Sequence, residues 1–229
     1  MSTNLAQQLR VGTTKSHSMA ENVSFVKSFL GGVVDKKSYR KLVANLYFVY
    51  TAIEEEMENN KDHYAVKSIY FPQLYRQSSL CKDLFYYYGS NWRNIIQPSL
   101  ATKNYVNRIH EIGVSQPELL IAHAYTRYMG DLSGGQILKK IAKSAMGLSD
   151  KYGTEFYDFH DIVDESIFKK QYRNALDNVP ISEKQVTQII AEANIAFNLN
   201  MQVFQELNSN FIKIMLMLLL NTVNNFIRI

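Results

Sequence analysis

The chain of 229 residues has one cysteine, four prolines and ten glycines, and each shortage excludes something. A single cysteine, Cys81, cannot form an intramolecular disulfide framework, which indicates a reducing compartment. Because Cys81 lies in a helix-like run, we expect a buried or half-buried structural side chain rather than a nucleophile. With so few prolines and glycines to break the chain, long uninterrupted elements are expected.

The net charge of +4 is too small for the dense basic stripe that binds nucleic acid, so we expect no nucleic-acid partner. Lysine and arginine gather at 36–41 and 139–143, where they can attract an acidic protein, although we favour solvated helix faces. The first residues lack the apolar core of a signal peptide.

Near the other end, the unbroken apolar run 214–220 is far shorter than the ~20 residues of a membrane-spanning helix. We therefore expect the end of a packed helix there and no stable membrane anchor. A loose membrane contact is the alternative.

Apolar side chains recur at steps of three and four residues, the period of a helix with one buried face. Sustained alternation, which marks strands, is missing. We predict an all-α fold, a single-domain helical bundle over residues 1–229. The clearest apolar stripe consists of Tyr39, Leu42, Val43, Leu46, Val49, Tyr50, Ile53 and Met57. The expected helices are 4–14, 17–30, 36–59, 77–88, 101–112, 116–147, 164–177 and 182–222.

Two expected helix starts carry the spacing of a capping box, in which Ser or Thr and a Glu or Gln three residues later bond each other's backbone N–H groups. Ser115 and Glu118 form the first such pair, and Gly113 just before them suits the end of the preceding helix. Ser182 and Gln185 form the second.

The stretch GDLSGGQ, residues 130–136, places Gly130, Gly134 and Gly135 inside a predicted helix. Glycine there costs about 1 kcal/mol relative to alanine, so the three glycines need a reason. LSGGQ also spells the signature of ABC-type ATPases, but no strand and no G-x-x-x-x-G-K-[ST] loop accompany it, which excludes that class. Two reasons stay open: close packing of another helix, or a flat ligand against the backbone.

None of the five histidines belongs to a zinc motif, so a protein-held catalytic zinc is not expected. A heme needs only one axial histidine, and His17 has the best surroundings. It continues an N-terminal helical stripe, and Glu21, four residues on, can reach the second imidazole nitrogen. We expect His123 to be a hydrogen-bonded core residue. The remaining histidines, expected in polar or surface positions, are His63, His110 and His160.

Other polar residues suit a site for an acidic ligand. Asp131 directly follows the first glycine and can anchor water and relay protons, or else form a surface ion pair with Arg127. Residues that could meet ligand carboxylates, although each alone could equally be solvated, are Arg10, Tyr125, Lys169 and Arg173.

Together these residues closely resemble heme oxygenase, most of all the soluble cyanobacterial and plastid type. YTRYMGDLSGGQILKKIA, residues 125–142, is similar to that family's distal-helix motif, and TKSHSMAEN, residues 14–22, to its proximal-ligand segment. NLYFVYTAIEEEM and IYFPQL also resemble the family, so the likeness covers nearly the whole chain. It implies a heme sandwiched between a proximal helix and a kinked, glycine-rich distal helix.

The resemblance implies a role for each candidate residue. His17 would be the proximal iron ligand with Glu21 as its orienting partner, and Asp131 would hold the water that delivers protons on the distal side. Further members of the distal network or wall would be Tyr50, Arg127, Gly130, Gly134 and Gly135. The heme propionates would meet Arg10, Tyr125, Lys169 and Arg173; the mammalian-type pattern has Lys at position 10, which keeps the charge.

By the same resemblance, heme is both substrate and cofactor. O2 and electrons from reduced ferredoxin would open it at the α-meso carbon to biliverdin IXα, CO and ferrous iron. An acidic ferredoxin suits a basic protein, a bilin reductase would follow, and the place would be a cyanobacterial cytoplasm or a plastid stroma. Two rivals remain. A heme carrier would share the binding residues without needing Asp131, and a thiaminase-like enzyme would have only Cys81 as nucleophile.

Overall fold

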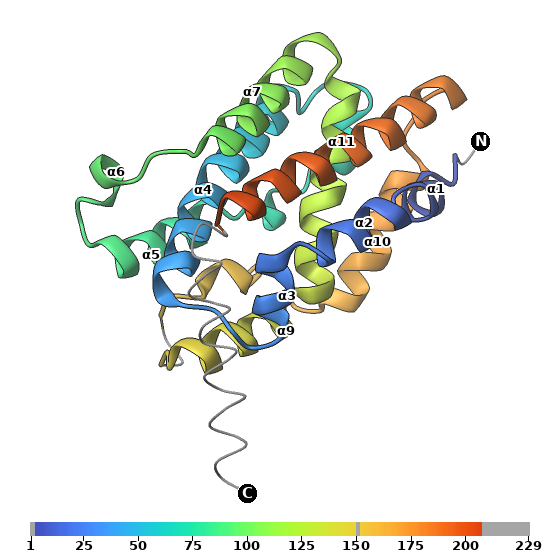
Figure 1. Cartoon of the computed structure of the whole chain (residues 1–229). Helices are drawn as coiled ribbons and strands as arrows, with labels where there is room; N and C mark the ends of the chain where they lie inside the picture. The colour runs from blue at the N-terminus through green and yellow to red at the C-terminus, as the bar shows by residue number, and fades with distance from the viewer. Residues whose placement is uncertain (1–2, 150–151, 208–229) are drawn as a thin grey trace, which may run out of the picture.

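The computed structural model describes residues 3–149 and 152–207, and these contain helices and no strand, which confirms the all-α prediction (Figure 1). The α-helices are α1 (Leu5–Gly12), α2 (Thr14–Glu21), α3 (Ser24–Leu30), α4 (Lys36–Asn59), α5 (Gln77–Tyr88), α6 (Trp92–Ile95), α7 (Leu100–Ser115), α8 (Leu120–Ala124), α9 (Gly130–Met146), α10 (Glu165–Asp177) and α11 (Glu183–Leu207). The short 3-10 helices are η1 (Val66–Ile69), η2 (Pro72–Leu74), η3 (Pro117–Leu119) and η5 (Glu155–Tyr157), and η4 (Tyr125–Met129) is a π-helix.

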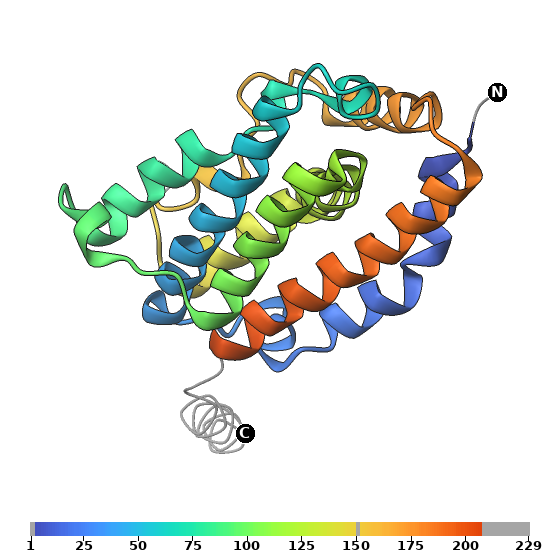
Figure 2. The same ribbon diagram turned by 90° about the horizontal axis from the view of Figure 1, so that it is seen from above.

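Helix α4 runs through the bundle and packs against α5, α7, α8 and α11. All eight side chains of its predicted apolar stripe are buried, so the helical period identified the core face correctly. Helix α11 returns along α1, α2 and α3, and Figure 2 shows it running beside them. The segment α8–η4 lies between α4 and α11 and contacts both of these helices.

The two predicted capping boxes have different outcomes. Ser182 and Gln185 do bond reciprocally: the Ser182 N–H donates to Gln185 Oε1 at 3.0 Å, and the Gln185 N–H donates to Ser182 Oγ at 3.4 Å. At Ser115 the prediction was wrong, because α7 continues to that residue and its hydroxyl donates back to the Glu111 carbonyl at 2.7 Å. Gly113 does not end the helix either. It is buried where a Cβ would collide with the Glu56 side chain.

Two predicted helices are divided in the structure. The expected helix 17–30 separates into α2 and α3 because Val23 has an extended backbone (φ −61°, ψ 134°). The expected helix 116–147 contains the π-helix η4, which ends directly before Gly130. A π-turn inserts one extra residue into a helix, so the irregularity precedes the glycines, while α9 itself is regular from Gly130 onward.

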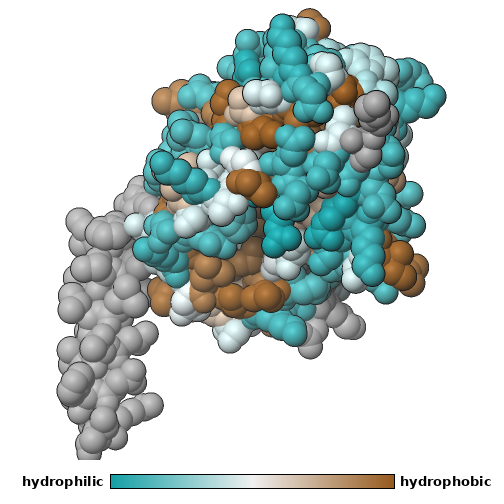
Figure 3. Space-filling view, turned by 90° about the vertical axis from the view of Figure 1, so that its right-hand side faces the viewer, coloured by the Kyte–Doolittle hydropathy of each residue, from teal (hydrophilic) through white to brown (hydrophobic). Residues whose placement is uncertain are grey.

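Figure 3 shows a face of the molecule that is mostly hydrophilic, with separate apolar patches. Cys81 is half-buried, as expected for a structural side chain. Within residues 3–149 and 152–207, no helix is long and apolar enough to cross a membrane. The predicted apolar run 214–220, and helix 182–222 beyond Leu207, lie outside the described residues.

Candidate active site

His17 stands on the exposed face of α2, a helix without any buried residue. Its Nδ1 lies 3.6 Å from Glu21 Oε1, as the four-residue spacing predicts, and the ring of Phe197 on α11 meets the imidazole edge-on at 5.8 Å. Among the described residues Nε2 has no hydrogen-bond partner. Glu21 and Phe197 therefore orient a ring whose second nitrogen is available to a ligand.

The residues of the predicted distal network meet in one buried cluster. Tyr50 on α4 donates a short hydrogen bond to Asp131 Oδ2 on α9, and Arg127 Nε donates to the Tyr50 hydroxyl at 2.9 Å. Asp131 Oδ1 lies 3.7 Å from Arg127 Nη2, which is too long for a direct hydrogen bond. That oxygen therefore keeps the capacity to accept from a water molecule.

Charge and burial shift the pKa of Asp131 in opposite directions. Burial raises the pKa of the Asp131 carboxyl, against the lowering effects of the Arg127 charge and the Tyr50 hydrogen bond. Burial also raises the pKa of Tyr50 well above its ordinary value, which keeps its hydroxyl protonated as a donor. A buried carboxylate beside a fixed guanidinium and a fixed hydroxyl suits proton transfer more than a solvated surface pair would.

The glycines of α9 divide into two sets. A Cβ added at Gly130 or Gly134 would meet nothing within 4 Å, whereas one at Gly135 would lie 3.5 Å from Tyr157 Cδ1. That distance is an ordinary van der Waals contact, so close packing of another helix requires none of the three glycines, although Gly135 does lie against Tyr157. Gly130 and Gly134, one helical turn apart, present bare backbone to open space, which is the geometry a flat ligand needs.

The predicted carboxylate-binding residues come from α1, η4 and α10. The charges of Arg173 and Arg10 both lower the pKa of the Tyr125 hydroxyl, against the rise that burial causes, so the three side chains converge. Lys169, one turn before Arg173, donates to the Leu132 carbonyl of α9 at 3.3 Å. Helices α1 and α10 also pack against each other, which gathers these cations at one end of the site.

The other histidines lie away from this cluster. His123 is fully buried, and its Nε2 lies 2.9 Å from Glu192 Oε1, which confirms the expected core role. His110 pairs with Glu56 at 2.7 Å, and His160 is exposed beside Glu155.

Sequence reasoning missed two residues on α11. Asn200 accepts from Arg127 Nη1 at 2.8 Å, and Phe197 orients His17. The available signal was a polar Asn200 three residues after Phe197, on the same helix face as the apolar Ala193 and Ala196.

Comparison with known proteins identifies the family of this chain. Residues 3–206 match the family described as heme oxygenase. Heme oxygenase of Porphyra purpurea is 68% identical over 226 residues, which are 99% of this chain and 96% of the relative. Heme oxygenase 1 of Nostoc sp. is 60% identical over 222 residues, 97% of this chain and 93% of the relative.

The fold comparison leads to the same family. The crystal structure of heme oxygenase-1 from the cyanobacterium Synechocystis sp. in complex with heme has a TM-score of 0.91 at 57% identity, covering 96% of this chain and 99% of that one. Heme oxygenase from Leptospira interrogans has a TM-score of 0.87 at 47% identity, covering 90% of this chain and 100% of that one. The family match, the relatives that align over nearly the whole chain and the fold all agree. The chain belongs to the heme oxygenase family.

Proposed function

We propose that this heme oxygenase holds heme between α2 and α9, with His17 Nε2 as the iron ligand. The exposed imidazole supports this role, because the Glu21 carboxylate lies on the Nδ1 side of the ring, at 3.6 Å, and leaves Nε2 available. The other face of the heme would lie against α9, where Gly130 and Gly134 offer a backbone without side chains. A neutral histidine ligand leaves the iron able to bind dioxygen.

When bound, heme supplies the iron that binds O2 and the ring that is opened to biliverdin, CO and ferrous iron. The chain's own contribution on the distal side is Asp131, whose Oδ1 would hold a water while Oδ2 accepts from Tyr50. Arg127 fixes the Tyr50 hydroxyl and so fixes the carboxylate. This network beside an open glycine face is the observation that carries the proposal, because a heme carrier needs neither.

The choice of meso carbon would follow from how the heme is rotated about the iron–histidine axis. Arg10, Tyr125, Lys169 and Arg173 would hold the propionates, and this would set the rotation of the ring and so the meso carbon that is attacked. We propose the α-meso carbon and biliverdin IXα as product.

We further propose reduced ferredoxin as electron donor and a bilin reductase as the next enzyme. The overall basic charge supports an acidic donor, and Lys36, Lys37, Lys41 and Lys140 are exposed in the two basic clusters. The relatives of 60–68% identity named above come from a red alga and a cyanobacterium, which supports a plastid stroma or a cyanobacterial cytoplasm. The family match from residue 3 to residue 206 supports one heme oxygenase domain for 1–229.

One experiment tests the whole proposal. The purified protein is mixed with one equivalent of hemin, and reduced ferredoxin with its reductase is added in air. We expect a sharpened Soret band that decays while a red biliverdin band rises, with product identified as the IXα isomer by chromatography. A Soret band that stays stable with active donor would indicate a carrier, and no Soret shift would remove His17 as the ligand.

A further inference from the structure

Segment 154–160, which follows the helix α9 and contains η5, lies against one side of that helix just after the glycines. Lys139 Nζ on α9 contacts both Asp158 carboxylate oxygens, at 2.6 and 2.5 Å. Gln136 Nε2 donates to the Tyr157 carbonyl at 3.0 Å, and the Tyr157 ring faces Gly135. Segment 154–160 therefore contacts α9 at three positions between Gly135 and Lys139.

The segment is itself fixed to the body of the protein. The buried Asp83 of α5 accepts from the backbone N–H groups of Glu155 at 2.9 Å and Phe156 at 2.8 Å. Arg76 is also buried, donates to the Asp158 carbonyl at 2.5 Å and stacks on the Phe159 ring at 3.8 Å. A segment anchored in this way can hold a helix in place.

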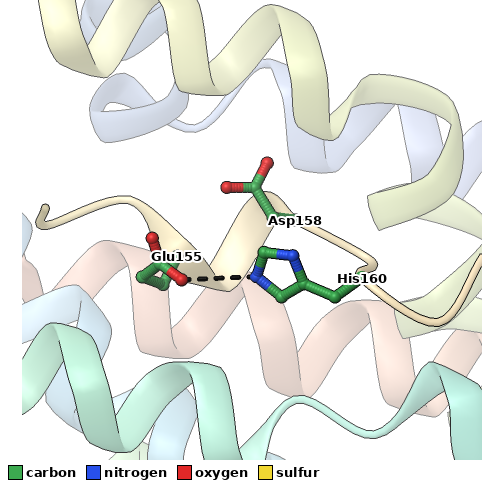
Figure 4. A group of neighbouring side chains, drawn as sticks. All are labelled: Glu155, Asp158 and His160. Atoms are coloured by element: carbon green, nitrogen blue, oxygen red, sulfur yellow. Dashed lines mark hydrogen bonds and ion pairs between the residues drawn. The ribbon is translucent and has the colours of Figure 1, made fainter. Parts of the chain in front are cut away.

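A metal site is the competing explanation for this segment, because ligand atoms of Glu155, Asp158 and His160 lie within 4.8 Å of one another. Figure 4 shows His160 turned toward Glu155 while the Asp158 carboxylate points away from both. That carboxylate already carries the Lys139 ammonium on both oxygens. Because the Lys139 ammonium already neutralises the Asp158 carboxylate, the observations favour a Lys139–Asp158 ion pair over a metal site.

We infer that the Lys139–Asp158 pair is a clasp that positions α9 over the heme, an inference that rests on the proposed role of α9 as the distal wall. Three glycines within six residues give this helix little stiffness of its own. Asp131 lies one turn before Gly135, so a shift of α9 at the clasp moves the proton-donating carboxylate. The side chains are only 18% and 22% exposed, and such a pair is weakly screened. Lys139 and Asp158 are therefore positioning residues.

The test compares Lys139→Met and Asp158→Asn with the control Lys184→Met, an exposed lysine on α11 outside both basic clusters. Hydrogen exchange of the α9 amides in the heme-free protein should accelerate about tenfold in both clasp variants and not in the control. Lys139→Arg should restore slow exchange. With heme bound, turnover should fall by up to about a hundredfold and other biliverdin isomers should appear, since a misplacement of about 1 Å can cost that much.

Unchanged α9 exchange in Lys139→Met would overturn the clasp. Equal acceleration in α4 and α11 would overturn it too, because the pair would then serve global stability alone. Wild-type protein that binds heme without cleaving it would overturn the proposed function while leaving the exchange result to stand by itself.

Discussion

Arg127 Nη1 donates to Asn200 Oδ1 at 2.8 Å, and this joins the distal cluster to α11 one turn after Phe197. Phe197 in turn contacts the ring of His17 edge-on at 5.8 Å. One face of a single helix thus contacts both the proposed iron ligand and the guanidinium of the predicted distal network. Helix α11 therefore connects α2 with the cluster of Tyr50, Arg127 and Asp131.

Asn200→Ala should loosen the distal network and lower stability. The substitution removes the acceptor of a buried guanidinium N–H, so we expect a loss of about 1–3 kcal/mol in the free energy of unfolding. Urea unfolding of the heme-free protein measures this. Asn198→Ala, at an exposed position of the same helix, is the control. Equal stability of the two variants would mean that Asn200 does not hold Arg127.

His17→Ala should remove the axial ligand without harming the fold, because the side chain is 60% exposed and its helix buries nothing. We expect the loss of the histidine-ligated heme spectrum and its recovery when imidazole is added. His160→Ala, also exposed, should keep the wild-type spectrum. A wild-type spectrum from His17→Ala would refute the assignment of this ligand.

Asp131→Asn should bind heme and lose ring opening. The amide keeps the shape and the Tyr50 contact but cannot take up or deliver protons, and general acid–base groups contribute about 10²–10⁴-fold to rates. Biliverdin yield under single-turnover conditions measures the loss, with Ser133→Ala on the exposed side as control. Full yield from Asp131→Asn would exclude the carboxylate from the mechanism.

Gly134→Ala should move stability and activity in opposite directions. The added methyl meets nothing within 4 Å in the protein, so the helix gains about 0.4–1 kcal/mol from the stiffer residue. The same methyl enters the space proposed for heme and should reduce turnover. Ser144→Ala, exposed on the same helix, should change the melting temperature without changing turnover. Normal turnover by Gly134→Ala would contradict the placement of heme on this face.

Glu54→Gln should change how stability depends on pH. Burial raises the pKa of Glu54 from 4.5 to about 7, against the hydrogen bonds it accepts from the Arg76 and Gln77 backbone. Between these values the unfolded chain loses a proton that the folded protein keeps, so the wild type loses stability as pH rises, by roughly 3 kcal/mol in total.

The Gln variant lacks this titration. Its stability relative to the wild type should therefore rise from pH 4.5 to 7 and stay level above. Denaturant unfolding across this range provides the measurement, with the exposed Glu55→Gln as control. Parallel pH profiles for the wild type and Glu54→Gln would show that the Glu54 carboxyl titrates normally.

Local spacing in the sequence determined much of this protein. The α4 core stripe, the His17–Glu21 pair, the Arg127–Asp131 pair and the Ser182–Gln185 cap all follow from helix geometry, because residues three or four apart on a helix are always neighbours. The GDLSGGQ motif also predicted a ligand-facing backbone, and Gly130 and Gly134 of that motif do face open space.

Tertiary structure decided the contacts that join distant segments. Tyr50 and Asp131 are 81 residues apart, Arg127 and Asn200 are 73 apart, and no spacing rule connects them. The same packing explains the errors: Gly113 makes room for Glu56 instead of ending a helix, and a π-turn precedes Gly130. A helix fixes its own neighbours through its repeat, whereas partners across the bundle depend on how the helices pack.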